Sequence, residues 1–292
     1  MSQFGLVVLN GLSWGMTVFL TAAGLTLVFG ILHILNFAHG GFVMLGAYLA
    51  YSMLSRLGPP SLWTFAAATL GCALILGLVG AMLDRIVFQR LRGVGQSYSL
   101  IATYALLLLC QGMVKIVWGI DFLSVAPPPE LAGGTELFGT FAPNFILFVI
   151  GCGVAVFLAL DHVVHRTELG KTVQSVAADP WMASLLGVNV RAILAGTVVV
   201  GIALGGMAGG LLSINQSLSP NMGGALIIQA FGVIVVGGMG SIRGAFLASI
   251  VLGVVTTLGD HFFTEIPGLF FYVALVAILL WRPQGLMQGS RL

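Results

Sequence analysis

Long uninterrupted stretches of apolar residues dominate the pattern of hydrophobic and polar positions along this chain. Several stretches exceed 18 residues, the length that indicates a membrane-spanning helix. The strands of a bacterial outer-membrane barrel would instead alternate apolar and polar residues over segments of about ten. The pattern therefore predicts membrane helices, which we place at residues 7–29, 41–54, 62–83, 98–118, 145–160, 193–214, 225–236, 245–258 and 267–281.

The predicted fold class is an all-α polytopic membrane protein with about 8–10 transmembrane helices or half-helices. Several predicted spans are too short to cross a hydrocarbon core of about 30 Å, so eight, nine or ten crossings all agree with the pattern. We expect residues 1–292 to form one transmembrane domain. Two longer connections interrupt it, at about 119–143 and 163–192.

Composition excludes several other classes of protein. Hydrophobic residues make up 59% of the 292 residues before the 41 glycines are counted, and charged residues only 7%, against about 25% in a soluble domain. A soluble enzyme, a disordered chain and a nucleic-acid-binding protein are all excluded, so no nucleic acid is expected as a partner. Cys72, Cys110 and Cys152 are odd in number and lie in apolar runs, which predicts buried thiols and no disulfide scaffold.

The distribution of charge predicts how the chain is oriented. Basic residues gather in segments 84–96 and 163–192 and in the C-terminal tail, at Arg85, Arg90, Arg92, Arg166, Lys171, Arg191, Arg282 and Arg291. Segment 119–143 contains Asp121, Glu130 and Glu136 and has no Lys or Arg. By the positive-inside rule, the basic segments and the C-terminus are cytoplasmic and segment 119–143 is outside.

The predicted spans lack the groups that pumps and enzymes use. Only Lys115 lies even one turn inside a span, so a proton or ion relay within the membrane is disfavoured. Gly170-Lys171-Thr172 lacks the upstream glycine of a phosphate-binding loop, since His165 stands there. The histidines show no metal-ligand spacing. We therefore predict no catalytic residue, no metal site and no cofactor, and any energy for uphill transport must come from outside the chain.

Two glycine-rich segments interrupt the apolar pattern. The first, 29–41, places His33, Asn36 and His39 before Gly40 and Gly41. Irregular backbone at membrane depth must face protein or a water-filled cavity. We expect Asn36 to bond freed backbone groups, and Gly40 and Gly41 to adopt positive φ. A plain turn between two spans is the alternative.

The second glycine-rich segment, 236–244, has the same construction and includes Gly237, Gly238 and Gly240. Two interrupted segments, one early and one late, typically indicate a transport path. A third group of glycines, Gly201, Gly205 and Gly209, has the helical spacing that lets two helices approach closely.

Segment 163–192 predicts two helices outside the membrane. Residues 168–178 can form the first. Asp179 then offers an N-cap oxygen, Pro180 fits the first helical position and Gly187 supplies a C-terminal stop. The second helix, 180–186, would expose Trp181, Met182, Leu185 and Leu186. These side chains pack either on the chain's own spans or on a soluble partner, and we favour the partner.

Several motifs resemble the permease subunits of branched-chain amino acid ABC transporters. The first is GLTLVFG at 24–30, followed by ILNFAHG at 34–40 and MLGAY at 44–48. The second is ADP at 178–180 with LLGVNV at 185–190. The third is VGGMGSI at 236–242, and the chain ends with RPQGL at 282–286. The likeness runs in matching order nearly from end to end.

The resemblance implies a multi-pass permease of the cell inner membrane. It would work with a second homologous permease, two ATP-binding subunits and a periplasmic solute-binding protein, and only the ATP-binding subunits would use ATP. The resemblance also implies that segment 163–192 couples to the ATPase through Asp179, Pro180, Trp181, Met182, Ala183, Leu185 and Gly187. The general ABC pattern Glu-Ala-Ala-x-x-x-Gly falls on 181–187, where only Ala183 and Gly187 match.

Leucine, isoleucine and valine are the solutes that the resemblance implies, while urea, short amides and other amino acids remain alternatives. Two other classes of function also stay open. One is a self-sufficient channel for a small neutral solute, with His33 and His39 lining the pore. The other is a membrane-embedded enzyme that uses these histidines, which the absence of an accompanying carboxylate or nucleophile disfavours.

Overall fold

A computed structural model describes residues 2–57, 61–137 and 140–287 of the chain. Each of the predicted spans falls on a helix. These helices are α1 (Ser2–Leu32), α2 (Ala38–Leu57), α3 (Leu62–Leu83), α5 (Gln96–Trp118), α7 (Asn144–Arg166), α10 (Val190–Asn215), α11 (Met222–Gly237), α12 (Ile242–Phe262) and α13 (Leu269–Trp281).

Among the described residues, six helical stretches are long and apolar enough to cross a membrane. They are Phe4–Leu32, Leu62–Leu91, Gln96–Trp118, Asn144–Arg166, Val190–Asn215 and Ile242–Phe262. The second includes α3 and its continuation through the π-helix η1 (Asp84–Phe88) and the short α4 (Gln89–Leu91). The protein is therefore an all-α polytopic membrane protein, as predicted. The cysteines Cys72, Cys110 and Cys152 are free thiols.

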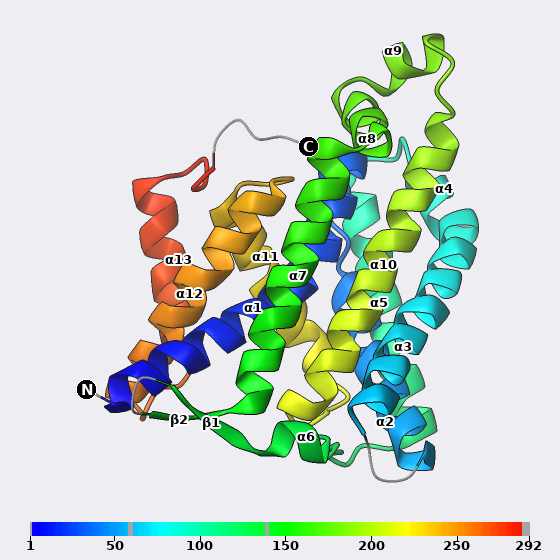
Figure 1. Cartoon of the computed structure of the whole chain (residues 1–292). Coiled ribbons are helices and arrows are strands. Elements are labelled where there is room, and N and C mark those ends of the chain that lie inside the picture. The colour runs from blue at the N-terminus through cyan, green and yellow to red at the C-terminus, as the bar shows by residue number, and fades with distance from the viewer. Residues whose placement is uncertain (1, 58–60, 138–139, 288–292) are drawn as a thin grey trace.

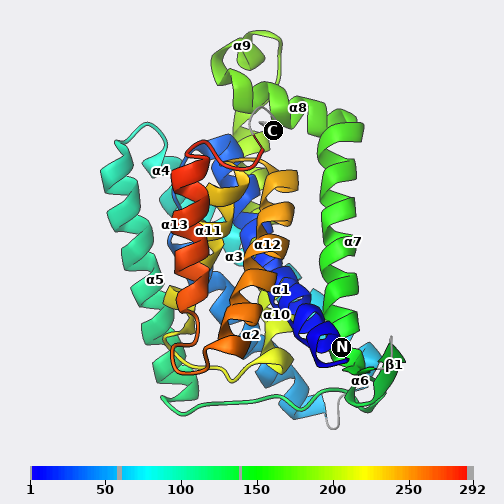
Figure 2. The same cartoon turned by 90° about the vertical axis from the view of Figure 1, so that its left-hand side faces the viewer.

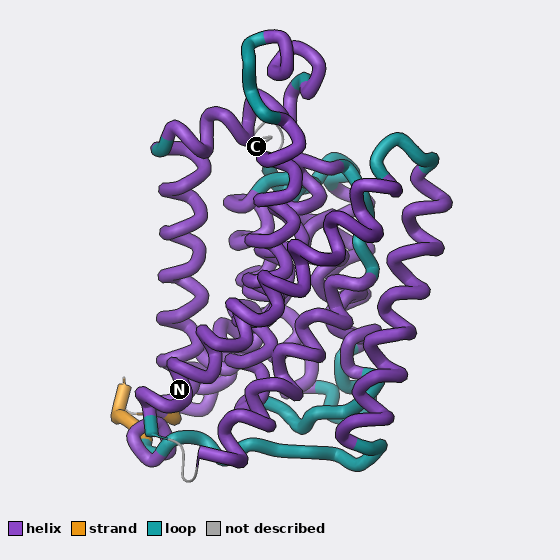
Figure 3. The backbone as a smooth tube through the Cα atoms, turned by 90° about the vertical axis from the view of Figure 1, so that its right-hand side faces the viewer, coloured by secondary structure: helices purple, strands orange, loops and turns teal. Residues whose placement is uncertain are grey.

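The two ends of the helix bundle carry different elements (Figure 1). One end, called the α9 end here, bears α8 (Glu168–Ala178), α9 (Pro180–Leu185) and the last described residues. The other, the hairpin end, bears the start of α1, α6 (Pro129–Ala132) and the strands β1 (Gly134–Leu137) and β2 (Thr140–Pro143) (Figure 3). The strands pair antiparallel, with Glu136 opposite Phe141. This small hairpin lies in a segment for which the sequence predicted no element.

The predicted charge segregation appears as a difference between these two ends. The basic segment after α3 and the loop that contains α8 and α9 lie at the α9 end, while the acidic segment 119–143 lies at the hairpin end (Figure 2). Arg291 falls outside the described residues. At the α9 end, the buried carboxylate of Asp84 accepts hydrogen bonds from Gln89 and Arg92. Burial lowers the pKa of Arg92, and the adjacent Asp84 charge opposes that shift.

Helices α1 and α10 form the centre of the bundle. Within the most apolar window of each helix, 83% of α1 is buried, against 17% of α7 at the edge of the bundle. Two parallel glycine tracks explain how α10 packs against several neighbours. A Cβ on Gly201 would lie 2.9 Å from the Gly24 carbonyl of α1, and a Cβ on Gly206 would lie 2.8 Å from the Cys72 carbonyl of α3. The glycines thus serve close helix packing.

Candidate functional site

The first glycine-rich segment is a true helix break that folds back into the bundle. Helix α1 ends at Leu32, where His33 adopts a left-handed φ of 53° and its N–H bonds the Phe29 carbonyl at 2.9 Å. Helix α2 begins at Ala38, and His39 in its first turn reaches Thr21. Thr21 lies eleven residues before the end of α1, about 16 Å along the helix axis. Residues 33–37 therefore return in an extended path to the interior.

Thr103 of α5 holds this break together. Its hydroxyl accepts a hydrogen bond from the Phe37 N–H at 3.2 Å and lies 2.9 Å from the Ser99 carbonyl of its own helix and 3.2 Å from the Leu35 carbonyl. Because Thr103 is completely buried, these backbone groups receive a protein partner away from water, as irregular backbone in a membrane requires. The break is held by a hydroxyl from a helix distant in sequence, and sequence analysis did not identify Thr103.

His39 is enclosed between three helices. Its Nε2 donates to the Thr21 carbonyl at 3.0 Å, and the side chain is fully buried. A Cβ on Gly24 of α1 would lie 2.8 Å from the His39 ring, and one on Gly205 of α10 would lie 3.1 Å from it. The glycines of α1 and α10 therefore leave room for the imidazole. These contacts fix the position of the first turn of α2 relative to α1 and α10.

Two detailed predictions for this break were wrong. Both amide atoms of Asn36 are buried without a hydrogen-bond partner among the described residues, so Thr103, and not Asn36, bonds the freed backbone groups. Gly40 and Gly41 are helical, and His33 takes the positive φ instead. Gly40 is required for another reason, since a Cβ there would lie 2.1 Å from the Gly223 carbonyl of α11. The two glycines lie at points of close helix approach.

The second glycine-rich segment is a tight turn at the α9 end, between α11 and α12. Gly237 is the last residue of α11, whereas Gly238 and Gly240 have φ of 103° and 88°. The Ser241 hydroxyl caps α12 by accepting the Gly244 N–H at 3.1 Å. A Cβ on Gly240 would lie 3.2 Å from Cα of Gly30. The two glycine-rich segments therefore meet where α1 ends.

The C-terminal motif closes this turn. After α13, Gly285 has a φ of 86°, and the Leu286 N–H bonds the Val236 carbonyl at 2.7 Å. The Met287 N–H bonds the Gly237 carbonyl at 3.3 Å. These contacts bring the third motif and the chain's last motif together, although about forty residues separate them. Backbone hydrogen bonds therefore hold the tail across the α11–α12 turn.

The predicted short helix at the α9 end is present as α9, one residue shorter than expected. Asp179 Oδ1 accepts the Trp181 and Met182 N–H groups, each at 2.9 Å, and Pro180 occupies the first helical position. Gly187 has a φ of 84°, which confirms the predicted left-handed stop. The side chains of Trp181, Met182, Leu185 and Leu186 are exposed, whereas Ala183 is buried within the hydrophobic cluster beneath α9.

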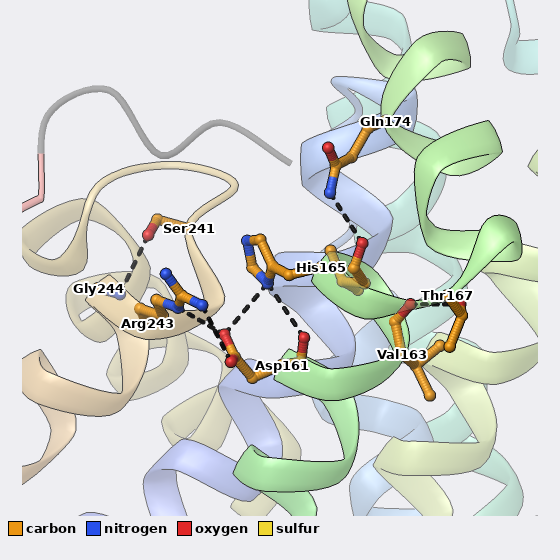
Figure 4. A network of polar contacts seen from close by, with 9 residues as sticks. Asp161, Val163, His165, Thr167, Gln174, Ser241, Arg243 and Gly244 are labelled. Carbon is orange, nitrogen blue, oxygen red and sulfur yellow. Dashed lines mark hydrogen bonds and ion pairs between the residues drawn. The ribbon is translucent and has the colours of Figure 1, made fainter.

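Helix α9 follows α7 and α8, whose junction is held by a network of polar contacts (Figure 4). The Arg243 guanidinium at the start of α12 forms two hydrogen bonds to the Asp161 carboxylate of α7, at 2.5 and 3.0 Å. His165 Nδ1 lies 3.1 Å from the same carboxylate. One turn further, Gln174 of α8 donates to the Val164 carbonyl at 2.8 Å. The α7–α8 junction is thus joined to the α11–α12 turn. This ion pair was also missed, because its partners lie 82 residues apart.

A cavity of about 300 Å³ lies at the hairpin end between α1, α10, α11 and α12, and Ile146 of α7 also lines it. Neutral polar side chains from these four helices line it together with apolar ones. Asn10, Ser13 and Thr17 all come from one face of α1, a spacing visible in the sequence but not used in the sequence analysis. No group of three His, Cys, Asp or Glu side chains could hold a metal ion within the described parts of the chain.

Taken together, these features define a polytopic α-helical protein of the membrane with two ends of different chemistry. A polar cavity lies at one end and an apolar helix extends from the other. Residues 7–279 match the family model described as the branched-chain amino acid transport system, permease component. The chain belongs to this family of permease components.

Individual relatives agree with the family. The high-affinity branched-chain amino acid transport system permease protein BraD of Pseudomonas aeruginosa is 31% identical, over 95% of this chain and 94% of that protein. The corresponding LivH protein of Escherichia coli is 29% identical, over 95% of this chain and 93% of LivH. The permease protein LivM of the same organism is 27% identical, over 92% of this chain and 67% of LivM.

Proposed function

We propose that this chain is a membrane-spanning permease subunit of an ATP-driven importer and that it forms half of the translocation path. The solutes that we propose are the branched-chain amino acids leucine, isoleucine and valine. Membership of the permease family supports this proposal, as do the names of BraD and LivH. The structural observation that carries it is the exposed apolar face of α9.

Helix α9 presents more apolar surface than a monomer in water would favour. Trp181 is 67% exposed and Leu186 80% exposed, and Met182 and Leu185 lie beside them. Burying one Leu- or Met-sized side chain contributes about 1.5–3 kcal/mol. A few such contacts are enough to hold a soluble subunit against the membrane domain, so α9 is the element that we expect to bind an ATPase.

The proposal includes four kinds of partner. Two ATP-binding subunits hydrolyse ATP, and the chain itself is a transport subunit that needs no cofactor of its own. A periplasmic solute-binding protein delivers the solute. A second homologous permease completes the path, and the similarity of this chain to both LivH and LivM of one organism supports such a pair.

We also propose a location and an orientation. The cell inner membrane follows from the importer class, and the α9 end with the C-terminus faces the cytoplasm because basic residues gather there. The hairpin end, with Asp121, Glu130 and Glu136, faces the periplasm. Single cysteines at Glu130 and Gln174 should then react with impermeant thiol reagents from opposite faces of intact cells and inverted vesicles.

The coupling role of α9 is tested with Trp181→Asp and Gly187→Val. The first places a charge in the apolar contact, and the second forces a β-branched residue into a left-handed φ. We expect both variants to reach the membrane at normal levels but to lose co-purification of the ATPase and solute-stimulated ATP hydrolysis in proteoliposomes. Phe122→Asp is the control: Phe122 is an exposed aromatic residue (78%) in the loop at the hairpin end, and this variant should leave both unchanged.

Wild-type ATPase binding and stimulation in both variants would contradict the coupling role. A stand-alone channel is distinguished by placing this chain alone in liposomes, where solute flux without ATP would support the channel. His39 is fully buried in this structure, so it does not line an open pore. Uptake of radiolabelled leucine, urea and acetamide by the complete transporter separates the candidate solutes.

A further inference from the structure

The cavity at the hairpin end combines neutral polar groups with apolar walls. Helix α1 contributes Asn10, Ser13 and Thr17, and Asn215, Gln229 and Thr257 come from the other walls. Trp14, Val18 and Leu226 supply the apolar surface. None of the residues that line the cavity carries a charge.

The amide side chains of this cavity have unused hydrogen-bonding groups. In the part of the chain that the structure describes, the side chains of Asn10, Asn215 and Gln229 form no hydrogen bond with protein. An amide buried in hydrocarbon without a partner costs several kcal/mol. Asn10 and Asn215 are exposed and Gln229 is half-buried, so these amides can bind water or a solute, and the cavity is a polar inlet within the apolar bundle.

The polar face of α1 leads from this inlet toward the first helix break. Asn10, Ser13, Thr17 and Thr21 follow one another at intervals of three or four residues, so they lie on one face of the helix. Thr21 is completely buried, and its carbonyl receives the hydrogen bond of His39. The cavity therefore stops between Thr17 and Thr21, about 6 Å apart along the axis. Val18, Leu212 and Leu226, which are nearly fully buried, form its floor.

We propose that this cavity is a solute-binding inlet of the permease for a small solute with a neutral or zwitterionic polar end and a short aliphatic group. The amide of Gln229 binds the polar end by hydrogen bonds, and the hydroxyl of Thr17, which donates its proton to the Ser13 carbonyl at 2.9 Å, accepts one more. Val18 and Leu226 contact the aliphatic group. A singly charged solute is disfavoured because the lining offers no opposite charge. This inference rests on the proposed function and assigns a solute site within it.

Cysteine accessibility tests the inlet independently of transport. In a background without Cys72, Cys110 and Cys152, single cysteines replace Thr17, Gln229 or, as a control, Val251 on the exposed outer face of α12. We expect an impermeant thiol reagent to modify Thr17→Cys and Gln229→Cys in the complete transporter, from the hairpin end only. Val251→Cys should not react, because it faces lipid. Lack of reaction at both inlet positions from either side would overturn the proposal.

Solute contact is tested by protection and by uptake. Saturating L-leucine should slow modification of Thr17→Cys and Gln229→Cys at least threefold. Gln229→Leu should lower the maximal rate of leucine uptake about tenfold at normal membrane levels and normal ATPase co-purification. Gln111→Leu, a polar residue of α5 outside the cavity, is the matched control and should transport normally. Reactive cysteines without leucine protection, together with normal uptake in Gln229→Leu, would contradict solute binding here.

The two proposals fail in different ways. If the wild-type transporter shows no ATP-dependent leucine uptake, the proposed function fails, whatever the cysteines report. If wild-type uptake is normal while the inlet cysteines neither react nor are protected, only the inlet assignment fails. ATPase co-purification in the Gln229→Leu variant separates a defect in the path from a defect in coupling.

Discussion

The two glycine-rich segments look alike in sequence, but different kinds of contact stabilise them. In the first, at 33–37, side chains of other helices hold the backbone, through Thr103 and through His39 on the Thr21 carbonyl. In the second, at 238–241, the backbone closes on itself and on the tail, with Ser241 N–H on the Gly238 carbonyl and Leu286 N–H on the Val236 carbonyl. One segment is an interior junction, and the other is a turn at the end of the bundle.

The glycines of the two segments also have different roles. Gly40 and Gly41 are helical, and their positions require glycine because neighbouring helices leave no room for a side chain. Gly238 and Gly240 are needed for their positive φ. Glycine content alone therefore indicates an unusual place in the chain, but it does not distinguish close packing from a special backbone conformation. The comparison can be tested by substitutions that affect one requirement at a time.

The largest effect is expected from Gly238→Ala in the second segment. Its φ of 103° and ψ of 121° suit only glycine, and a Cβ there would lie 2.8 Å from the Met287 carbonyl. Backbone strain of this kind costs about 1–3 kcal/mol, and the tail must also move. We expect the midpoint of thermal unfolding in detergent to fall by about 5–10 °C. Gly119→Ala, with a φ of 87° and open space around it, measures the strain alone. An equal loss in both variants would show that the tail contact contributes nothing.

The next effect is expected from Thr103→Val in the first segment. The two side chains have nearly the same shape, but valine leaves the Phe37 N–H without a partner inside the bundle and removes the hydroxyl that the Leu35 and Ser99 carbonyls share. Leaving a buried backbone group unpaired costs about 1–3 kcal/mol, so the thermal midpoint should fall by several degrees. The control is Thr197→Val on α10, whose hydroxyl donates only to the Ile193 carbonyl of its own helix. If Thr103→Val is as stable as this control, the break does not depend on the hydroxyl.

Much of the fold follows from the sequence, because each relevant signal is local. Apolar runs located the spans, and Asp179, Pro180 and Gly187 located α9 almost to the residue, since caps and stops act within one turn. The predicted boundaries of α8, 168–178, match the structure. The roles of these residues in coupling stay predictions.

The contacts that stabilise the site could not be predicted from the sequence, because they join helices that are distant along the chain. Thr103 acts on a segment 66 residues earlier, and Arg243 pairs with a carboxylate 82 residues earlier. No spacing along the chain reveals such pairs. The polar face of α1 is different, because Asn10, Ser13, Thr17 and Thr21 show it directly at helical intervals. Assigning the polar positions of an apolar span to faces of the helix would have predicted this side of the cavity.

The smallest effect on stability, and the most informative for function, is expected from Asn36→Leu. The Asn36 amide is fully buried, and neither of its polar atoms has a hydrogen-bond partner among residues 2–57, 61–137 and 140–287. Leucine therefore removes no hydrogen bond, and the free energy of unfolding should stay within about 1 kcal/mol of the wild-type value. Thr69→Val is the matched control, because the Thr69 hydroxyl is likewise buried and unpartnered, on α3 away from the break.

The two variants should differ in transport. An unpartnered buried amide costs free energy in this conformation. We therefore expect the Asn36 amide to gain a hydrogen-bond partner when the break rearranges during transport. On this argument Asn36→Leu should reduce ATP-dependent solute uptake at normal membrane levels, whereas Thr69→Val should transport normally. Unchanged uptake in Asn36→Leu would mean that the amide has no part in transport. The first segment would then be a junction of the same passive kind as the α11–α12 turn.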